Sequence, residues 1–209
     1  MRRIKLVHLI GIILVIIAIV VIANKIFKNK EDEHKLLKIY NDLNSSQAYS
    51  FEMEQSNDNK TIMAKKEDKT LIDQYSEDSH STTLIKGNNT YLILHDREEY
   101  YVYENNNIEQ NILTDGLKSV VDKEFITDSE KVKGKKYSYE EYAGSTMFMV
   151  SSSLDVDEAD IRTRFYFDKN DNLVYIKTIY GGKQELLKIN LQKEAEDKLF
   201  EIPSHYAEN

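Results

Sequence analysis

The chain has 209 residues, no cysteine, no tryptophan and a formal net charge of −8 at neutral pH. The lack of cysteine excludes disulfides, thiolate metal sites, a cysteine nucleophile and a lipid attached through cysteine. Residues 1 to 30 hold six basic and no acidic residues, so the other 179 residues carry a net charge of −14, which disfavours nucleic acid and anionic headgroups as partners.

An uncharged apolar run of 18 residues comes first, from Leu6 to Ala23. As an α-helix it would span about 27 Å, close to the thickness of the hydrocarbon core of a bilayer. Cleavage after Ala23 is the alternative, but no polar stretch separates that point from the apolar core. We therefore expect residues 1–30 to form a cytoplasmic stub and a single transmembrane anchor. Residues 31–209 would be one extracytoplasmic domain at the cell membrane.

Elements with helical and then β periodicity follow the anchor. Apolar residues at helical spacing predict a short amphipathic helix from Glu33 to Leu43. After it the period changes to two, because Tyr49, Phe51 and Met53 alternate with polar residues. The connections are too short for parallel crossovers, so an antiparallel meander is predicted. Its further strands are Lys60 to Lys66, Thr70 to Ser76, Ser81 to Lys86, Thr90 to His95 and Glu99 to Glu104.

A second short helix is predicted within Asn105 to Asp128, with Thr114 or Asp115 as its N-terminal cap. A helix inserted in a meander covers one face of the sheet, and here it would be the lid of any cavity. The residues expected to contact the sheet are Leu113, Leu117, Val120 and Val121.

Further strands are predicted after this helix. Gly134 should lie in a turn next to the strand Lys135 to Tyr142. Because side chains alternate along a strand, Tyr137, Tyr139 and Glu141 should share one face, and Ser138, Glu140 and Tyr142 the other. The remaining strands are Thr146 to Val150, Ile161 to Asp168, Leu173 to Ile179 and Gln184 to Leu191.

This order of elements resembles the LolA-like superfamily of bacterial lipoprotein carriers and their Gram-positive relatives. The phrases that carry the resemblance are Ser50-Phe51-Glu52-Met53, Val132 to Tyr142, Phe165-Tyr166-Phe167-Asp168 with Asn172-Leu173-Val174, and Asp197 to Tyr206. The resemblance implies a LolA-like incomplete β-barrel with a helical lid. Together with the apolar run before it, the expected fold class is α+β, mainly antiparallel β, with an N-terminal transmembrane helix followed by this barrel. In the founding carriers the apolar cavity of the barrel takes acyl chains.

Residue patterns with catalytic or metal-binding chemistry are scarce. The histidines fall in different predicted elements without the spacing of a helical metal motif. Asp168, Asn170 and Asn172 begin like a calcium loop, but Leu173 and Ile179 replace its glycine and its final glutamate, which predicts a hairpin turn. No nucleophile elbow or phosphate-binding loop occurs. We therefore expect no catalytic residue, no metal and no cofactor.

Tyrosine, with fourteen residues, gives the strongest remaining signal for binding. Aromatic side chains suit pleated sheets and also line lipid, carbohydrate and protein-binding surfaces, so a role in the core is the alternative for each of them. Together with the lid residues, the candidate ligand-binding residues are Tyr91, Tyr101, Tyr103, Tyr137, Tyr139, Leu117, Val120 and Val121.

The expected function is that of a membrane-anchored, extracytoplasmic, non-catalytic binding module. Its ligand would be an acyl chain or lipoprotein, or a protein of the cell envelope. One branch of the resembled superfamily, the clostridial spore-germination lipoprotein, implies a role as accessory protein of a spore-cortex amidase. A cell-envelope hydrolase is the alternative from another class. It would need convergent titratable groups in a cleft, whereas a lipid binder needs an apolar cavity.

Overall fold

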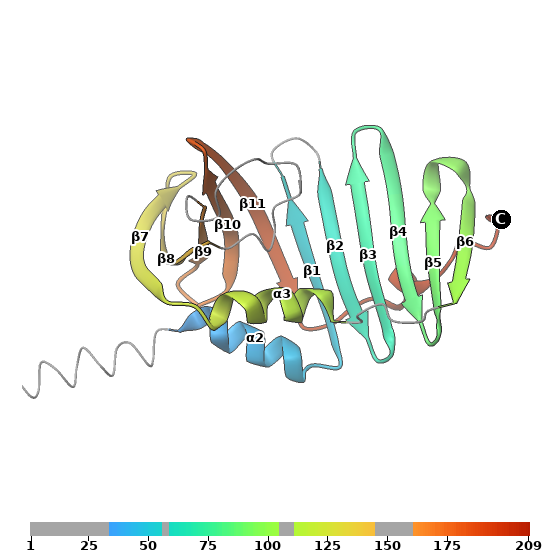
Figure 1. Ribbon diagram of the computed structural model, residues 1–209, viewed down its shortest axis with the longest axis horizontal. Helices are drawn as coiled ribbons and strands as arrows, with labels where there is room; N and C mark the ends of the chain where they lie inside the picture. The colour runs from blue at the N-terminus through green and yellow to red at the C-terminus, as the bar shows by residue number, and fades with distance from the viewer. Residues whose placement is uncertain (1–33, 56–58, 105–110, 145–160) are drawn as a thin grey trace, which may run out of the picture. The chain divides into compact units, whose positions relative to one another are not determined.

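The computed structural model describes residues 34–55, 59–104, 111–144 and 161–209 (Figure 1). The chain divides into two compact units, Met1–Lys35 and Leu36–Asn209. The second unit holds all the strands and the helices described below, apart from the first residue of helix α2.

The expected fold class needs a correction. The run Leu6 to Ala23, expected to be a transmembrane helix, lies outside the described residues, as does the expected strand Thr146 to Val150. Within the described ranges, no helix has the length and apolar character needed to cross a membrane. The described chain is instead a mainly antiparallel β-sheet with two short α-helices, α2 (Lys35–Ser45) and α3 (Ile112–Val121).

In the part of the chain that the structure describes, twelve strands form one open sheet in the order β12-β6-β5-β4-β3-β2-β1-β11-β10-β9-β8-β7. Neighbouring strands are antiparallel, except that β12 is parallel to β6. Six consecutive strands form a meander, and β11 then returns beside β1. The bounds are β1 (Ala48–Glu54), β2 (Lys60–Lys66), β3 (Lys69–Ser76), β4 (Ser79–Lys86), β5 (Asn89–Leu94), β6 (Glu99–Glu104), β7 (Phe125–Val132), β8 (Lys135–Ala143), β9 (Arg162–Phe167), β10 (Leu173–Tyr180), β11 (Lys183–Gln192) and β12 (Ala207–Glu208).

The predicted turn at Gly134 is confirmed. Gly134 has a φ of 82° and Lys133 a φ of 48°, so both lie in the left-handed region that a tight two-residue hairpin turn uses. The predicted split of strand β8 is also confirmed, because Tyr142 belongs to the large core cluster whereas Tyr139 belongs to a separate cluster on the other face.

Helices α2 and α3 pack against one face of the sheet, which we call the helix face. The predicted contacts of α3 with the sheet are confirmed, since Leu113, Leu117, Val120 and Val121 are all buried in this core. The predicted caps are wrong: the N-cap is Asn111, and Thr114 and Asp115 lie in the first turn. The core cluster under the helices contains Leu36, Leu43, Tyr49, Phe51, Met53, Tyr142, Phe165, Phe167, Leu173, Ile176, Leu187 and Ile189 besides the residues of α3.

The other face, which we call the opposite face, is covered over β2–β6 by the C-terminal segment. Phe200 and Ala195 of this segment are buried against Ala64, Leu71 and Leu84. A short 3-10 helix, η3 (Asp197–Phe200), places Phe200 in this contact, and β12 then pairs with β6. The C-terminal segment, which includes Asp197 to Tyr206, therefore contributes to a second apolar core on the opposite face of the sheet.

Candidate functional site

The predicted binding residues do not form one site. Leu117, Val120 and Val121 are buried in the core under α3. Tyr137 and Tyr139 lie on the opposite face of β8, in a cluster with Val132 and Tyr166. The structure thus places the lid residues and the tyrosines of β8 on different faces of the sheet.

The other three tyrosines lie at the β5–β6 end of the sheet. Tyr91 packs with Tyr100 in the cluster under the C-terminal segment. Tyr101 and Tyr103 point to the helix face of β6, and Tyr103 is 52% exposed. Tyr103 is therefore free for contacts with a ligand, whereas Tyr91 serves the core.

A groove of about 270 Å³ lies on the helix face, at the end of β1 that is remote from the helices. The register of the strands explains how it forms, because Met53 pairs with Thr61, Thr61 with Gln74 and Gln74 with Ser81. Paired residues share a face, so these side chains line one surface. The lining residues are Met53, Gln55, Asn59, Thr61, Gln74, Tyr75, Ser76, Ser79, Ser81 and Leu187.

The lining of this groove has two notable properties. None of the described residues that line it is charged, although charged residues make up 31% of the chain. Met53 and Leu187 belong at the same time to the core cluster under α2 and α3. The groove is therefore a continuation of the apolar core at the point where the helices no longer cover it.

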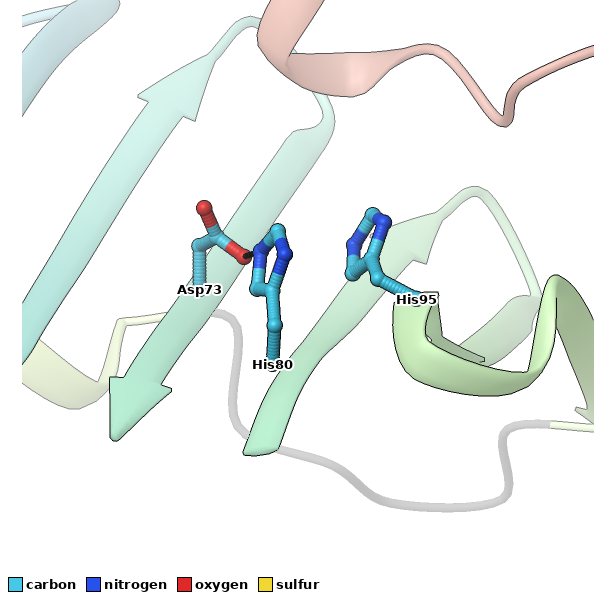
Figure 2. A group of neighbouring side chains, drawn as sticks. All are labelled: Asp73, His80 and His95. Carbon is cyan, nitrogen blue, oxygen red and sulfur yellow. Dashed lines mark hydrogen bonds and ion pairs between the residues drawn. The ribbon is translucent and has the colours of Figure 1, made fainter. Parts of the chain in front are cut away.

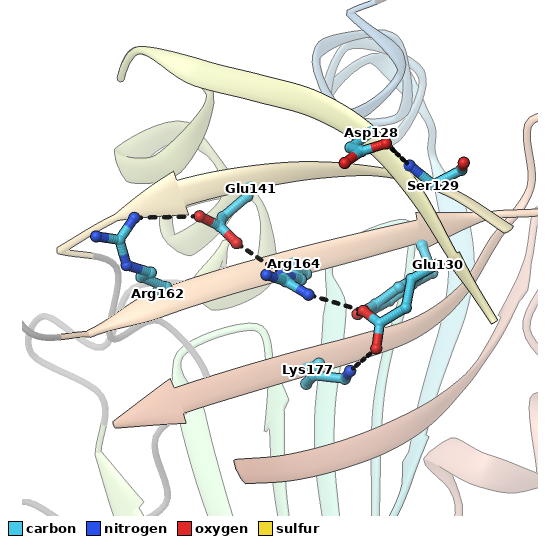
Figure 3. Close-up of polar contacts among 8 residues, drawn as sticks. Asp128, Ser129, Glu130, Glu141, Arg162, Arg164 and Lys177 are labelled. Carbon is cyan, nitrogen blue, oxygen red and sulfur yellow. Dashed lines mark hydrogen bonds and ion pairs between the residues drawn. The ribbon is translucent and has the colours of Figure 1, made fainter. Parts of the chain in front are cut away.

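A network of charged side chains lies on the opposite face of β7–β10 (Figure 3). The Arg164 guanidinium donates to Glu141 at 2.6 Å and to Glu130 at 2.7 Å. Glu130 also accepts from Lys177 Nζ and from the Tyr166 hydroxyl, both at 2.7 Å. These bonds fasten the edge strand β7 across to β9 and β10, so the network serves to hold the sheet together.

The pKa of Glu130 shows the strength of this network. Burial alone would raise it, but the hydrogen bonds from Lys177, Tyr166 and Arg164 outweigh burial and lower the pKa of Glu130 to about 2. The folded state therefore favours the ionised carboxylate, and its stabilising effect is complete above the ordinary value of 4.5. It is lost as the pH falls from there toward 2.

Glu130→Gln should consequently lower the free energy of unfolding at pH 6 more than at pH 3. About a third of the side chain is exposed, so solvent screening limits the effect at pH 6 to about 1–2 kcal/mol. Urea denaturation at the two pH values measures it, and Glu124→Gln, at an exposed position next to β7, is the matched control. An equal loss at both pH values would contradict a role of the ionised carboxylate.

Three side chains with metal-ligating atoms meet on the opposite face, where β3 and β5 end and β4 begins (Figure 2). Asp73 comes from β3, His80 from β4 and His95 from the turn η1 (His95–Arg97) after β5. The register brings them together, because Tyr75 pairs with His80 and Asp73 with Thr82. We call Asp73, His80 and His95 the histidine cluster.

Hydrogen bonds connect the histidine cluster to its surroundings. His80 Nε2 lies 2.9 Å from Asp73 Oδ1, and the Thr82 hydroxyl donates to the same oxygen at 2.5 Å. Thr82 Oγ1 also lies 2.7 Å from His95 Nε2, and His95 Nδ1 lies 3.0 Å from the Tyr206 hydroxyl. Since the Thr82 proton goes to Asp73, His95 Nε2 is the donor to Thr82 in this arrangement.

Stacked rings hold the cluster in place. The rings of His80 and His95 stack with centroids 3.7 Å apart, and Tyr75 stacks on the other side of His80 at 3.8 Å. Burial, and after it the neighbouring His80, lower the pKa of His95. Burial, and after it the charge of Asp73, raise the pKa of Tyr75 to about 12.

Sequence reasoning missed this cluster, because it searched for histidines at spacings along one helix. The register of the predicted β3–β4 hairpin could have revealed the histidine cluster. In an antiparallel pair with a two-residue turn at Glu77-Asp78, residues 75 and 80 are opposite each other, and so are 73 and 82. Asp73-x-Tyr75 and His80-x-Thr82 therefore had to lie on one face.

The comparisons with known proteins give a limited result. No family model and no curated protein sequence matches the chain. Among solved structures, it is similar to an uncharacterised conserved protein from Thermus thermophilus, with a TM-score of 0.47 and 11% identity over 83% of this chain and 96% of the other. It is also similar to the Mycobacterium tuberculosis lipoprotein LppX, with a TM-score of 0.41 and 11% identity over 75% of this chain and 93% of LppX. Likeness at this level does not show a family.

Proposed function

We propose that the chain is a non-catalytic binding module whose uncharged groove takes an apolar chain, such as the acyl chain of a lipid or lipoprotein. The groove supports this proposal through its lining, whose side chains on the helix face offer Met53 and Leu187 for apolar contact and only hydroxyl and amide groups for polar contact. An ionic ligand would find no charged partner among these residues. An acyl chain would extend the packing of the core, and each methylene removed from water contributes about 0.8 kcal/mol.

The size of the groove also supports a chain-like ligand. Its volume of about 270 Å³ lies just below the range of roughly 300–1,000 Å³ of small-molecule pockets. It suits a stretch of one acyl chain rather than a complete multi-chain lipid.

A protein partner is the second candidate. The observation in its favour is the exposed Tyr103 next to Tyr101 on β6, because exposed tyrosines at a sheet end are typical anchors of protein interfaces. The roles as accessory protein of a spore-cortex amidase and as cell-envelope hydrolase, and the extracytoplasmic location, stay predictions from the sequence.

The groove is tested with a fluorescent fatty acid, 11-dansylaminoundecanoic acid. The wild-type chain should bind it with enhanced, blue-shifted emission, and Thr61→Asp, which places a carboxylate in the lining and also repels the carboxylate of the probe, should weaken binding at least tenfold. The matched control is Ser119→Asp on the exposed side of α3, which should bind like the wild type. Equal affinities of Thr61→Asp and the wild type would contradict the groove as the site.

A further inference from the structure

The histidine cluster has the donor set of a transition-metal site. Each of its three residues offers one ligand atom, and these atoms lie within 4.8 Å of one another. Ligand atoms around a tetrahedral ion with bonds of about 2.0–2.1 Å are separated by roughly 3.4 Å. His80 Nε2 and Asp73 Oδ1 are already 2.9 Å apart, so small side-chain movements place an ion between them.

The surroundings of the cluster are those that metal sites use. A ligating histidine needs a partner for its second ring nitrogen, which fixes the ring and its tautomer. For His95 this partner is the Tyr206 hydroxyl at 3.0 Å from Nδ1. When an ion takes Nε2, the ring proton moves to Nδ1 and the Tyr206 hydroxyl accepts the hydrogen bond.

His80 is held just as firmly. Tyr75 stacks on one side of its ring and His95 on the other. Its backbone N–H donates to Asp96 Oδ2 at 2.9 Å, which fixes the main chain of the ligand residue. The Asp96 carboxylate also brings a second negative charge close to the site. An ion would thus meet ligands that are already ordered.

The cluster is shielded and still accessible. The side chain of Asp73 is 8% exposed and that of His80 is 25% exposed, so a small ion can reach the ligands from solvent. Thr82 Oγ1, which contacts both Asp73 and His95, is in position for the fourth ligand. Calcium and magnesium prefer sets made only of oxygen, whereas two imidazoles and a carboxylate suit zinc and its neighbours.

We propose that Asp73, His80 and His95 bind one divalent transition-metal ion, with zinc as the best fit to the donor set. The bound ion would join β3, β4 and the end of β5 and, through His95 and Tyr206, the C-terminal segment. This site lies on the opposite face from the groove, so it is independent of the function proposed above.

Isothermal titration with ZnCl₂ tests the proposal on the full chain without an added histidine tag. Because the chain has no cysteine, thiolates cannot contribute to binding. One equivalent should bind, and Asp73→Asn and His95→Gln should each weaken the affinity at least tenfold. His34→Ala, which removes an imidazole outside the cluster, should leave the affinity unchanged. Circular dichroism of each variant without metal shows whether it is folded.

A second measurement keeps the test valid if a variant does not fold. In NMR spectra of the wild-type histidine rings, zinc should shift the nitrogens of His80 and His95 and leave those of His205 in place. Absence of zinc binding to the wild type, or binding with equal affinity in the folded variants, would overturn the proposal. So would zinc-induced shifts confined to His205 or His34, which would show adventitious surface binding.

Discussion

Leu117→Asp is expected to unfold the unit Leu36–Asn209. Leu117 is completely buried, and it lies in the cluster where α3 meets Phe51, Phe165 and Ile176. A carboxylate there has no water and would be placed against apolar side chains, which makes the substitution one of the most destabilising that a core permits. We expect a loss of about 4 kcal/mol or more, comparable to the whole stability of many domains. Thermal denaturation followed by tyrosine near-UV circular dichroism measures it.

Two further variants make the interpretation specific. Ser119→Asp places the same charge on the exposed side of α3 and should change stability by less than about 0.5 kcal/mol. Leu117→Ala leaves a cavity and should cost about 2–5 kcal/mol while the fold survives. If Leu117→Asp melted like Ser119→Asp, α3 would not be part of the core.

Glu140→Ala should have the second largest effect. Glu140 is 1% exposed, and its Oε2 accepts hydrogen bonds from the Tyr142 hydroxyl at 2.7 Å and from the Leu36 N–H at 3.3 Å. The Leu36 N–H belongs to the first turn of α2, where helix amides lack partners within the helix and a negative group is favourable. The truncation removes these two hydrogen bonds and leaves a cavity, so we expect a loss of about 2–4 kcal/mol in urea denaturation.

The two bonds can be separated by single substitutions. Tyr142→Phe removes one donor and keeps the carboxyl group for α2, so it should cost about 1–2 kcal/mol. Glu194→Ala removes an exposed carboxylate and should leave stability nearly unchanged. A Glu140→Ala variant as stable as Glu194→Ala would show that the buried carboxyl group does not hold α2 to the sheet.

Local patterns predicted much of the fold. Strands β2 and β6 have the predicted bounds, because alternation and turn residues are properties of neighbouring residues. Strand β7 was missed, since Phe125–Val132 is an edge strand that is mostly exposed and carries polar side chains on both faces. The two-residue strand β12 was missed because it forms only through its contact with β6. Whether such strands form depends on pairing with residues that are distant in the sequence.

The candidate sites were harder to predict than the fold. Leu117, Val120 and Val121 were expected both as core and as ligand-binding residues, and helical spacing alone cannot separate these roles. The groove draws Met53 and Leu187 from strands that are far apart in the sequence, so its lining depends on the pairing of β1 with β11. The histidine cluster depends in the same way on the register of one hairpin, which a search along helices does not consider.

The place of β11 in the sheet also has a consequence for how the chain reaches its native state. Strands β1–β6 are joined by short connections and can pair as they emerge from the ribosome, but β1 receives its second neighbour only when Gln192 has been synthesised. Until then one edge of β1 stays open to pairing with other chains. Closing such a long loop is slow compared with hairpin formation. The nascent edge of β1 is therefore exposed to such pairing for longer than the edges of the inner strands of the meander.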